Sequence, residues 1–149
     1  ETRVGSLVTI DEDVFLKRLA RTHSPEEVET AHQIFAWATQ NKGIDNWTTT
    51  GIYMPRFSYK GVDYNLIALT ATGKLSIRFG FLRYRPGPLR LRAERLQLCR
   101  QLNAIPGVTV ASGMEDKFPS IPLKRFSDEP QREALFEFLT TLIGKVREA

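Results

Sequence analysis

Residues 51–102 decide the fold of this chain: GIYMPRFSYK GVDYNLIALT ATGKLSIRFG FLRYRPGPLR LRAERLQLCR QL. Three segments in its first half are rich in β-branched and aromatic residues, and the pairs Lys60-Gly61 and Thr72-Gly73 separate them. Glycine accepts the positive φ that tight hairpin turns require. The pattern therefore predicts a three-stranded antiparallel meander.

The two glycines also predict a register. If each closes a two-residue loop, Tyr59 pairs with Val62 and Ala71 pairs with Lys74. Because side chains alternate along a strand, this register puts one set of side chains on a single core-facing surface. That set is Tyr53, Pro55, Phe57, Tyr64, Leu66, Ala68, Leu75, Ile77, Phe79 and Phe81. The opposite surface is mixed, with polar residues beside Met54, Ile67 and Leu69.

Helical patterns flank the meander on both sides. Apolar spacing and capping residues predict helices over 10–22, 25–43, 89–103 and from 128 to 146, and a short strand over 105–110. The third helix would turn Leu89, Ala93, Leu96 and Leu102 inward. The predicted fold is α+β: an N-terminal helical hairpin, the meander, then a helix, a short strand and a C-terminal helix packed as one layer on the sheet.

Length and composition predict one domain over residues 1–149, since 149 residues with 42% hydrophobic content suffice for one core. The chain opens at Glu1 and not at Met, so we expect either a fragment of a longer polypeptide or a processed product. Cys99 is the lone cysteine, which excludes a disulfide framework and a multi-cysteine zinc site, and we expect it to pack in its helix. No apolar run approaches the ~20 residues that span a bilayer, so we expect a cytoplasmic location without membrane contact.

The strongest clue to function is an excess of arginine after the third strand. Seven arginines between residues 78 and 100 are opposed by one acid, Glu94. They are Arg78, Arg83, Arg85, Arg90, Arg92, Arg95 and Arg100. A helix-forming residue whose stem covers apolar surface while its head stays solvated explains such a run. A phosphate-binding surface or contact with an acidic protein explains it too.

From this run we predict a non-catalytic module that binds nucleic acid, DNA or RNA, without a cofactor or a metal. Guanidinium groups bind phosphate oxygens bidentately, and an interleaved aromatic ring can stack on a base. The predicted contact residues are Arg56, Asn65, Arg78, Arg83, Tyr84, Arg85, Arg90 and Arg92. We predict no catalytic residue.

A second hypothesis is a module that binds a protein partner or a copy of itself. Met54, Ile67, Leu69 and Trp47 would form the apolar centre of that interface, and the arginines its charged rim.

A third hypothesis is a divergent metal-dependent nuclease-like domain. Glu115-Asp116-Lys117 contains the acid-x-Lys element of such sites, in which carboxylates hold Mg²⁺. Asp63 would have to supply a further carboxylate, because Glu94, the nearest acid upstream of the triplet, lies in a predicted helix. The triplet itself lies in a loop-like segment, so this hypothesis requires the loop to close on Asp63.

Overall fold

The computed structural model describes residues 2–4, 7–9, 12–41, 44–45 and 51–149 of the chain. Its α-helices are α1 Glu12–Ala20, α2 Pro25–Gln40, α3 Phe79–Leu82, α4 Arg92–Asn103 and α5 Glu129–Val146. Its strands are β1 Thr2–Val4, β2 Leu7–Thr9, β3 Ile44–Asp45, β4 Ile52–Tyr53, β5 Arg56–Tyr59, β6 Val62–Asn65, β7 Ile67–Thr70, β8 Lys74–Ile77 and β9 Ser120–Pro122. Three 3-10 turns are η1 Pro88–Arg90, η2 Met114–Asp116 and η3 Leu123–Phe126. The predicted α+β fold is confirmed.

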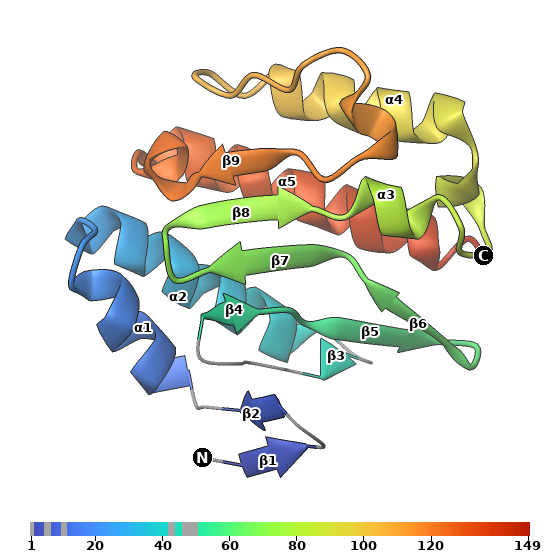
Figure 1. Cartoon of the computed structure of the whole chain (residues 1–149). Helices are drawn as coiled ribbons and strands as arrows, with labels where there is room; N and C mark the ends of the chain where they lie inside the picture. Colours follow the sequence, from blue (N-terminus) through green and yellow to red (C-terminus); the bar gives the residue numbers. More distant parts are fainter. Residues whose placement is uncertain (1, 5–6, 10–11, 42–43, 46–50) are drawn as a thin grey trace.

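All strand pairs are antiparallel, in the orders β1-β2, β3-β5-β6 and β4-β7-β8-β9. Helices α2 and α5 lie behind the strands in Figure 1, and α4 lies beyond β9 at the top of the view. The facing side of the four-stranded sheet carries no long helix in that view. None of the helices in the described ranges is long and apolar enough to cross a membrane.

The N-terminal helical pair forms, and the capping signal of its second helix is present as predicted. Ser24 caps α2 by accepting a hydrogen bond from the backbone amide of Glu27, while the Glu27 side chain accepts from the Ser24 amide. This reciprocal capping box satisfies two amides that have no partner inside the helix. The predicted end of the helix at residue 43 lies outside the described residues.

The first hairpin has the predicted register, and the second does not. Tyr59 pairs with Val62, but Lys74 pairs with Thr70 and not with Ala71. The second turn therefore has three residues, and Gly73 closes it with a φ of 85°. Three-residue hairpin loops characteristically end on such a left-handed residue. The hydroxyl of Thr70 supports this turn by accepting a hydrogen bond from the Lys74 amide.

That shift by one residue exchanges the two faces of β7. Leu69 lies opposite Leu75 and Ile67 lies opposite Ile77, so both face the core and both are fully buried. Ala68 therefore faces the other way, because a one-residue slip moves every side chain to the opposite face. The predicted apolar interface centred on Ile67 and Leu69 is wrong, since both side chains are internal. Trp47 lies outside the described residues.

The middle and last strands of the meander are shorter than predicted. Leu66 separates β6 from β7, and its carbonyl accepts a hydrogen bond from the Arg78 amide. After β8 the chain turns into α3, so Phe79 and Phe81 lie on a helix and not on a strand. This turn buries Phe79 and Leu82 together, because residues three apart share one face of a helix.

The predicted strand over 105–110 is wrong, and the final strand is β9, which pairs with β8. The Asn103 side chain explains the difference. It accepts a hydrogen bond from the Val110 amide and donates one to the Val110 carbonyl. The backbone groups of Val110 are therefore bonded to a side chain, whereas in a sheet they would bond to a neighbouring strand. In α5, by contrast, all the predicted core positions are buried: Leu135, Phe138, Leu139, Leu142 and Val146.

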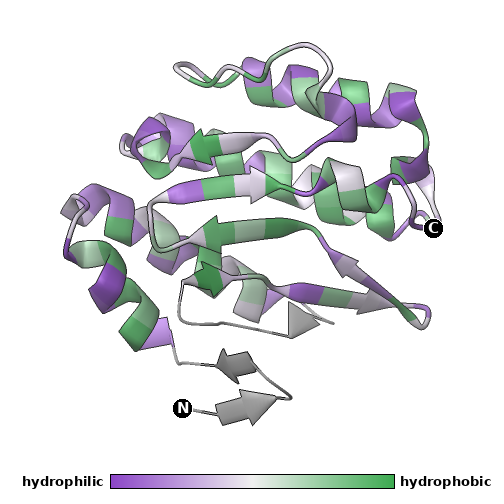
Figure 2. Ribbon diagram, in the orientation of Figure 1, coloured by the Kyte–Doolittle hydropathy of each residue, from purple (hydrophilic) through white to green (hydrophobic). Residues whose placement is uncertain are grey.

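The core lies between the sheet and its helices. Figure 2 shows hydrophobic colouring concentrated on the central strands and on parts of the helices behind them. Ring contacts join the two layers: Phe35 of α2 packs edge-on against Tyr53 at a centroid distance of 4.2 Å and against Phe15 of α1 at 5.5 Å. Cys99 is also buried, as predicted, and burial raises the pKa of its thiol to about 11.

Replacing Leu69 by Ala tests the register of β7. Because Leu69 faces the core, the substitution should lower the free energy of unfolding by about 2–5 kcal/mol. Leu91→Ala, at a side chain that is 59% exposed, is the matched control and should change it by less than about 0.5 kcal/mol. Urea denaturation measures both values. Equal, small effects would place Leu69 on the open face and contradict this register.

Candidate nucleic-acid interface

The arginine run contains one buried member, Arg95, which is 4% exposed. It belongs to the inner stripe of α4 with Leu98, Cys99 and Leu102, which follow at the i+3, i+4 and i+7 positions. The sequence-based assignment of Ala93 and Leu96 to this inner face is wrong, because Ala93 is exposed and Leu96 is half-buried. An arginine thus occupies a core position of the helix.

Each nitrogen of the Arg95 guanidinium has an acceptor. Nε donates to the backbone carbonyl of Glu115 at 2.8 Å, and Nη1 donates to the carbonyls of Leu89 at 2.9 Å and Arg90 at 2.8 Å. Nη2 donates to Oδ1 of Asp116 at 2.6 Å. Since an unpaired buried charge is strongly destabilising, these four bonds are what permits the guanidinium to be internal.

Two further arginines bind the same pair of acids. Arg92 donates from Nε and Nη2 to Oε2 of Glu115 at 3.2 and 3.1 Å, and Nη1 of Arg83 lies 3.5 Å from Oδ2 of Asp116. We call Arg83, Arg92, Arg95, Glu115 and Asp116 the Arg95 clasp. The clasp joins α4, η1 and η2 and reaches the end of α3.

The clasp holds both carboxyl groups in their charged form. A hydrogen bond from the Arg95 side chain is the main cause that lowers the pKa of Asp116. The pKa of Glu115 is lowered chiefly by its own backbone amide and next by Arg92, although burial opposes this shift. Both carboxylates therefore act as fixed counter-ions of the arginines.

The acids proposed for a nuclease-like site do not converge. Asp63 lies on the β5-β6 hairpin, where it accepts a hydrogen bond from the Ser58 hydroxyl at 2.7 Å, while Glu115 and Asp116 face arginines in the clasp. Across the ranges that the structure describes, no three His, Cys, Asp or Glu side chains are grouped so that they could hold a metal ion. The predicted trio is therefore not a metal site.

A second arginine group is built around aromatic rings. The guanidinium carbon of Arg78 lies 5.3 Å from the centroids of both Phe81 and Phe118. That of Arg85 lies 4.4 Å from the Phe81 centroid. Beside this row, the guanidinium carbon of Arg83 lies 4.7 Å from the Tyr84 centroid. We call these six residues the arginine–aromatic cluster: Arg78, Phe81, Arg83, Tyr84, Arg85 and Phe118.

The segment after η2 completes this cluster by approaching α3 closely. The Gly80 amide donates to the Lys117 carbonyl at 2.8 Å. A Cβ at Gly80 would lie 2.7 Å from the Phe118 ring and 3.1 Å from the Asp116 carbonyl oxygen. Because glycine at position 80 has no Cβ, the Phe118 ring can lie against α3 and reach the Arg78 guanidinium.

The cluster presents two rings to solvent. Tyr84 is 67% exposed and Phe118 is 46% exposed, although a guanidinium lies over each ring. Arg78 is half-buried, and burial lowers the pKa of its guanidinium. Its Nε atom is buried and has no hydrogen-bond partner among the described residues, and its guanidinium lies over the rings of Phe81 and Phe118.

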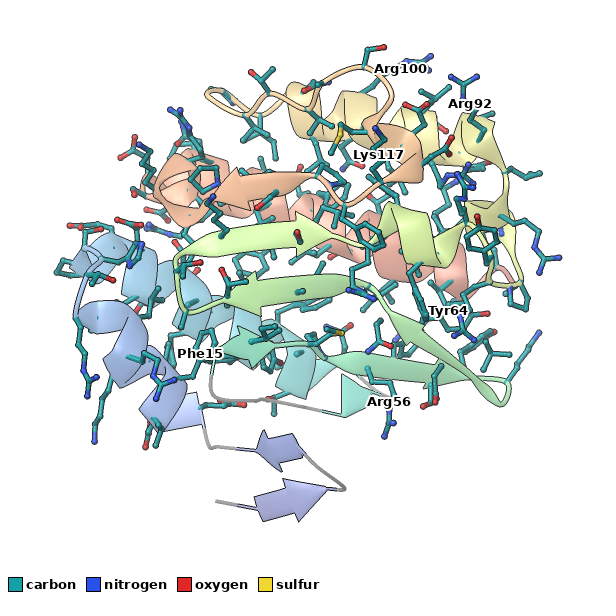
Figure 3. The ribbon with its side chains drawn as sticks, in the orientation of Figure 1. Phe15, Arg56, Tyr64, Arg92, Arg100 and Lys117 are labelled. Atoms are coloured by element: carbon teal, nitrogen blue, oxygen red, sulfur yellow. The ribbon has the colours of Figure 1, made fainter. Side chains whose placement is uncertain are left out.

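The predicted contact residues fall into three groups. Arg78, Arg83, Tyr84 and Arg85 come together at α3, and Arg56 pairs with Asn65 across β5 and β6. Arg92 is engaged by Glu115, and Arg90 is exposed at η1. Figure 3 shows Arg56 on the β5 side of the molecule and Arg92 on α4, well apart in that view, so one contact surface does not include all eight.

Sequence reasoning did not find Phe118 or the structural role of Arg95. Phe118 follows the acidic pair in a segment with no periodic pattern, and nothing in its neighbourhood points to α3. A signal for Arg95 does exist, because positions 95, 98, 99 and 102 form a helical stripe that is apolar except at its first member.

The chain matches no protein-family model, no curated protein and no solved structure.

Replacing Arg95 by Met tests the clasp. The substitution keeps a long apolar stem but leaves the carbonyls of Leu89, Arg90 and Glu115 and the Oδ1 atom of Asp116 without their donor, so it should lower the free energy of unfolding by about 3–5 kcal/mol. Arg100→Met on the exposed side of the same helix should change it by less than about 0.5 kcal/mol. Chemical denaturation at neutral pH gives both numbers.

The pH dependence gives a second readout for the same pair of variants. A carboxyl whose pKa is lowered by folding stabilises the protein above its unfolded pKa, about 3.9 for Asp, and this contribution is lost as the pH falls through the folded pKa. The stability difference between wild type and Arg95→Met should therefore shrink below about pH 4. A difference that stays constant on acidification would contradict the pairing of Arg95 with Asp116.

Proposed function

We propose that this chain is a non-catalytic module that binds single-stranded nucleic acid through the arginine–aromatic cluster. The observation that carries the proposal is the pairing of two exposed rings, Tyr84 and Phe118, with guanidinium groups on one face of each. Each ring is contacted by a guanidinium while a large part of its surface stays accessible to a base.

The phosphate contacts in this proposal come from cations outside the clasp. Arg90 and Lys117 are exposed, Arg85 is half-buried, and none of the three has an acidic partner among the residues that the structure describes. When such cations bind phosphates, the counterions condensed on the nucleic acid are released, and this release provides most of the affinity. Arg83 and Arg92 contribute less, because Asp116 and Glu115 already neutralise them.

Arg56 and Asn65 extend the proposed surface along the sheet. They face one another across β5 and β6, and the residue after Asn65, Leu66, accepts a hydrogen bond from the Arg78 backbone. A strand that leaves the cluster in this direction would meet a further cation and an amide. Asparagine can donate to and accept from the edge of a base.

The chemistry favours a single strand over a duplex. Bases in a duplex stack on each other and hide their faces, whereas those of a single strand can stack on aromatic side chains at about 1–3 kcal/mol for each base. Helix α3 has only four residues, so it is too short to lie along the groove of a duplex. Exposed rings interleaved with cations are the arrangement that single-strand binding requires.

Tyr84 variants test the stacking. With a short mixed-sequence oligonucleotide, as DNA and as RNA, Tyr84→Ala should weaken binding by about 1–3 kcal/mol, because it removes the platform for one base. Tyr84→Phe keeps the ring and loses only the hydroxyl that accepts a hydrogen bond from Arg83, so its affinity should stay close to wild type. Fluorescence anisotropy at several salt concentrations measures these affinities.

Arg85→Ala is measured in the same titrations, and it should reduce the slope of log K against log salt by about 0.7 for a single strand. The charge-matched control is Arg21→Ala. Arg21 follows α1 directly, and Figure 1 shows α1 at the opposite end of the sheet from α3. This substitution should leave the slope unchanged. Absence of salt-dependent binding at low ionic strength, or duplex bound more tightly than single strands, would refute the proposal.

A further inference from the structure

The helices behind the sheet leave a groove on the side away from the strands. Its larger part, about 720 Å³, lies along α5 and reaches Gln33 of α2, and an adjoining part of about 310 Å³ runs further along α2. The two parts share Gln33 and Phe136, so they form one continuous depression. We call it the α2–α5 groove.

The groove combines an apolar centre with an acidic border. Half-buried Phe136 and Ala36 lie with the largely buried Trp37 in its shared region. Along α5, Glu129, Glu133 and Glu137 line it at intervals of four residues, and all three are exposed. Residues four apart lie on one face of a helix, so the three carboxylates form a stripe beside the apolar centre.

Arg132, the cation that lines the groove, forms no ion pair with these glutamates in the described structure, and its single charge offsets only part of the stripe. Nη1 of Arg132 donates to the backbone carbonyls of Ser127 and Phe126, which holds its guanidinium at the start of α5. The amide of Gln33 donates to Glu29 at 3.1 Å, so a further carboxylate stands on the α2 side. The groove is therefore acidic in a chain whose formal net charge is +4.

We propose that the α2–α5 groove binds a basic amphipathic helix of a partner protein. The apolar side chains of such a helix, spaced three and four apart, would cover Phe136, Ala36 and Trp37, and its Lys or Arg side chains would face the glutamates of α5. From Glu129 to Thr141 the lining of α5 rises by twelve residue steps, or roughly 18 Å at 1.5 Å for each step, which matches about three turns of a docked helix.

Charge also separates this surface from the proposed nucleic-acid interface. A stripe of glutamates repels phosphates, whereas it attracts a basic helix and speeds its association. The two surfaces use different residues, so the groove is proposed independently of nucleic-acid binding.

The test uses the ¹⁵N-labelled full chain and a designed amphipathic helical peptide of Leu and Lys, with a peptide of Leu and Glu as its matched control. The Lys peptide should shift amide resonances of α2 and α5, and the Glu peptide should not. Glu133→Lys should weaken the affinity at least tenfold, as should Phe136→Ala. Glu26→Lys, an exposed acid of α2 outside the groove lining, should leave it within twofold.

Tyr84→Ala should bind the Lys peptide as wild type does, which separates this result from the nucleic-acid experiment. Equal binding of both peptides, shifts confined to α3, or loss of affinity in Glu26→Lys would overturn the proposal. Self-association of the chain through α2 and α5, detected by light scattering and abolished by Glu133→Lys, would overturn it too, because it would make a second copy the occupant.

Discussion

The structure depends on the burial of one guanidinium. Arg95 occupies a core position of α4, and such a charge is tolerated only when each of its nitrogens has an acceptor. The chain supplies those acceptors from η1 and η2, on either side of the helix in sequence. Satisfying Arg95 therefore determines where the segment around residues 114–118 lies. With that segment in place, Phe118 reaches the α3 surface over Gly80.

The clasp also divides the arginines by role. Arg83, Arg92 and Arg95 share two carboxylates, so much of the charge that looks available in the sequence is used inside the protein. The same two carboxylates resemble part of a metal-dependent catalytic motif when only the sequence is considered. In the structure they are counter-ions with lowered pKa values. Arg85, Arg90 and Lys117 lie outside this arrangement, and the proposed binding surface relies on them.

Local signals predicted most of the fold, and contacts between distant segments account for the errors at the candidate site. The capping box at Ser24, the Lys60-Gly61 turn and the inner face of α5 each depend on neighbours in sequence, and each is confirmed. The turn before Lys74 has three residues where two were predicted, and that single residue exchanged the faces of β7. Arg95 was taken for a surface residue because its partners lie some twenty residues away, and Phe118 was missed for the same reason. Of the predicted site, the residues that flank α3 form a cluster because they are close in sequence. The pairing of Arg92 with Glu115 could not be predicted, because the two residues lie far apart in sequence.

The division of the arginines can be observed directly in the side-chain Nε–H resonances of the ¹⁵N-labelled protein, recorded with and without single-stranded oligonucleotide. Because Arg95 is internal and fully bonded, its Nε–H should exchange slowly with water and should not shift when the oligonucleotide binds. Arg85 and Arg90 should exchange quickly in the free protein and should shift and become protected in the complex. Rapid exchange at Arg95, or a shift of Arg95 with none at Arg85 and Arg90, would contradict the assignment of these arginines to a structural clasp and a separate binding surface.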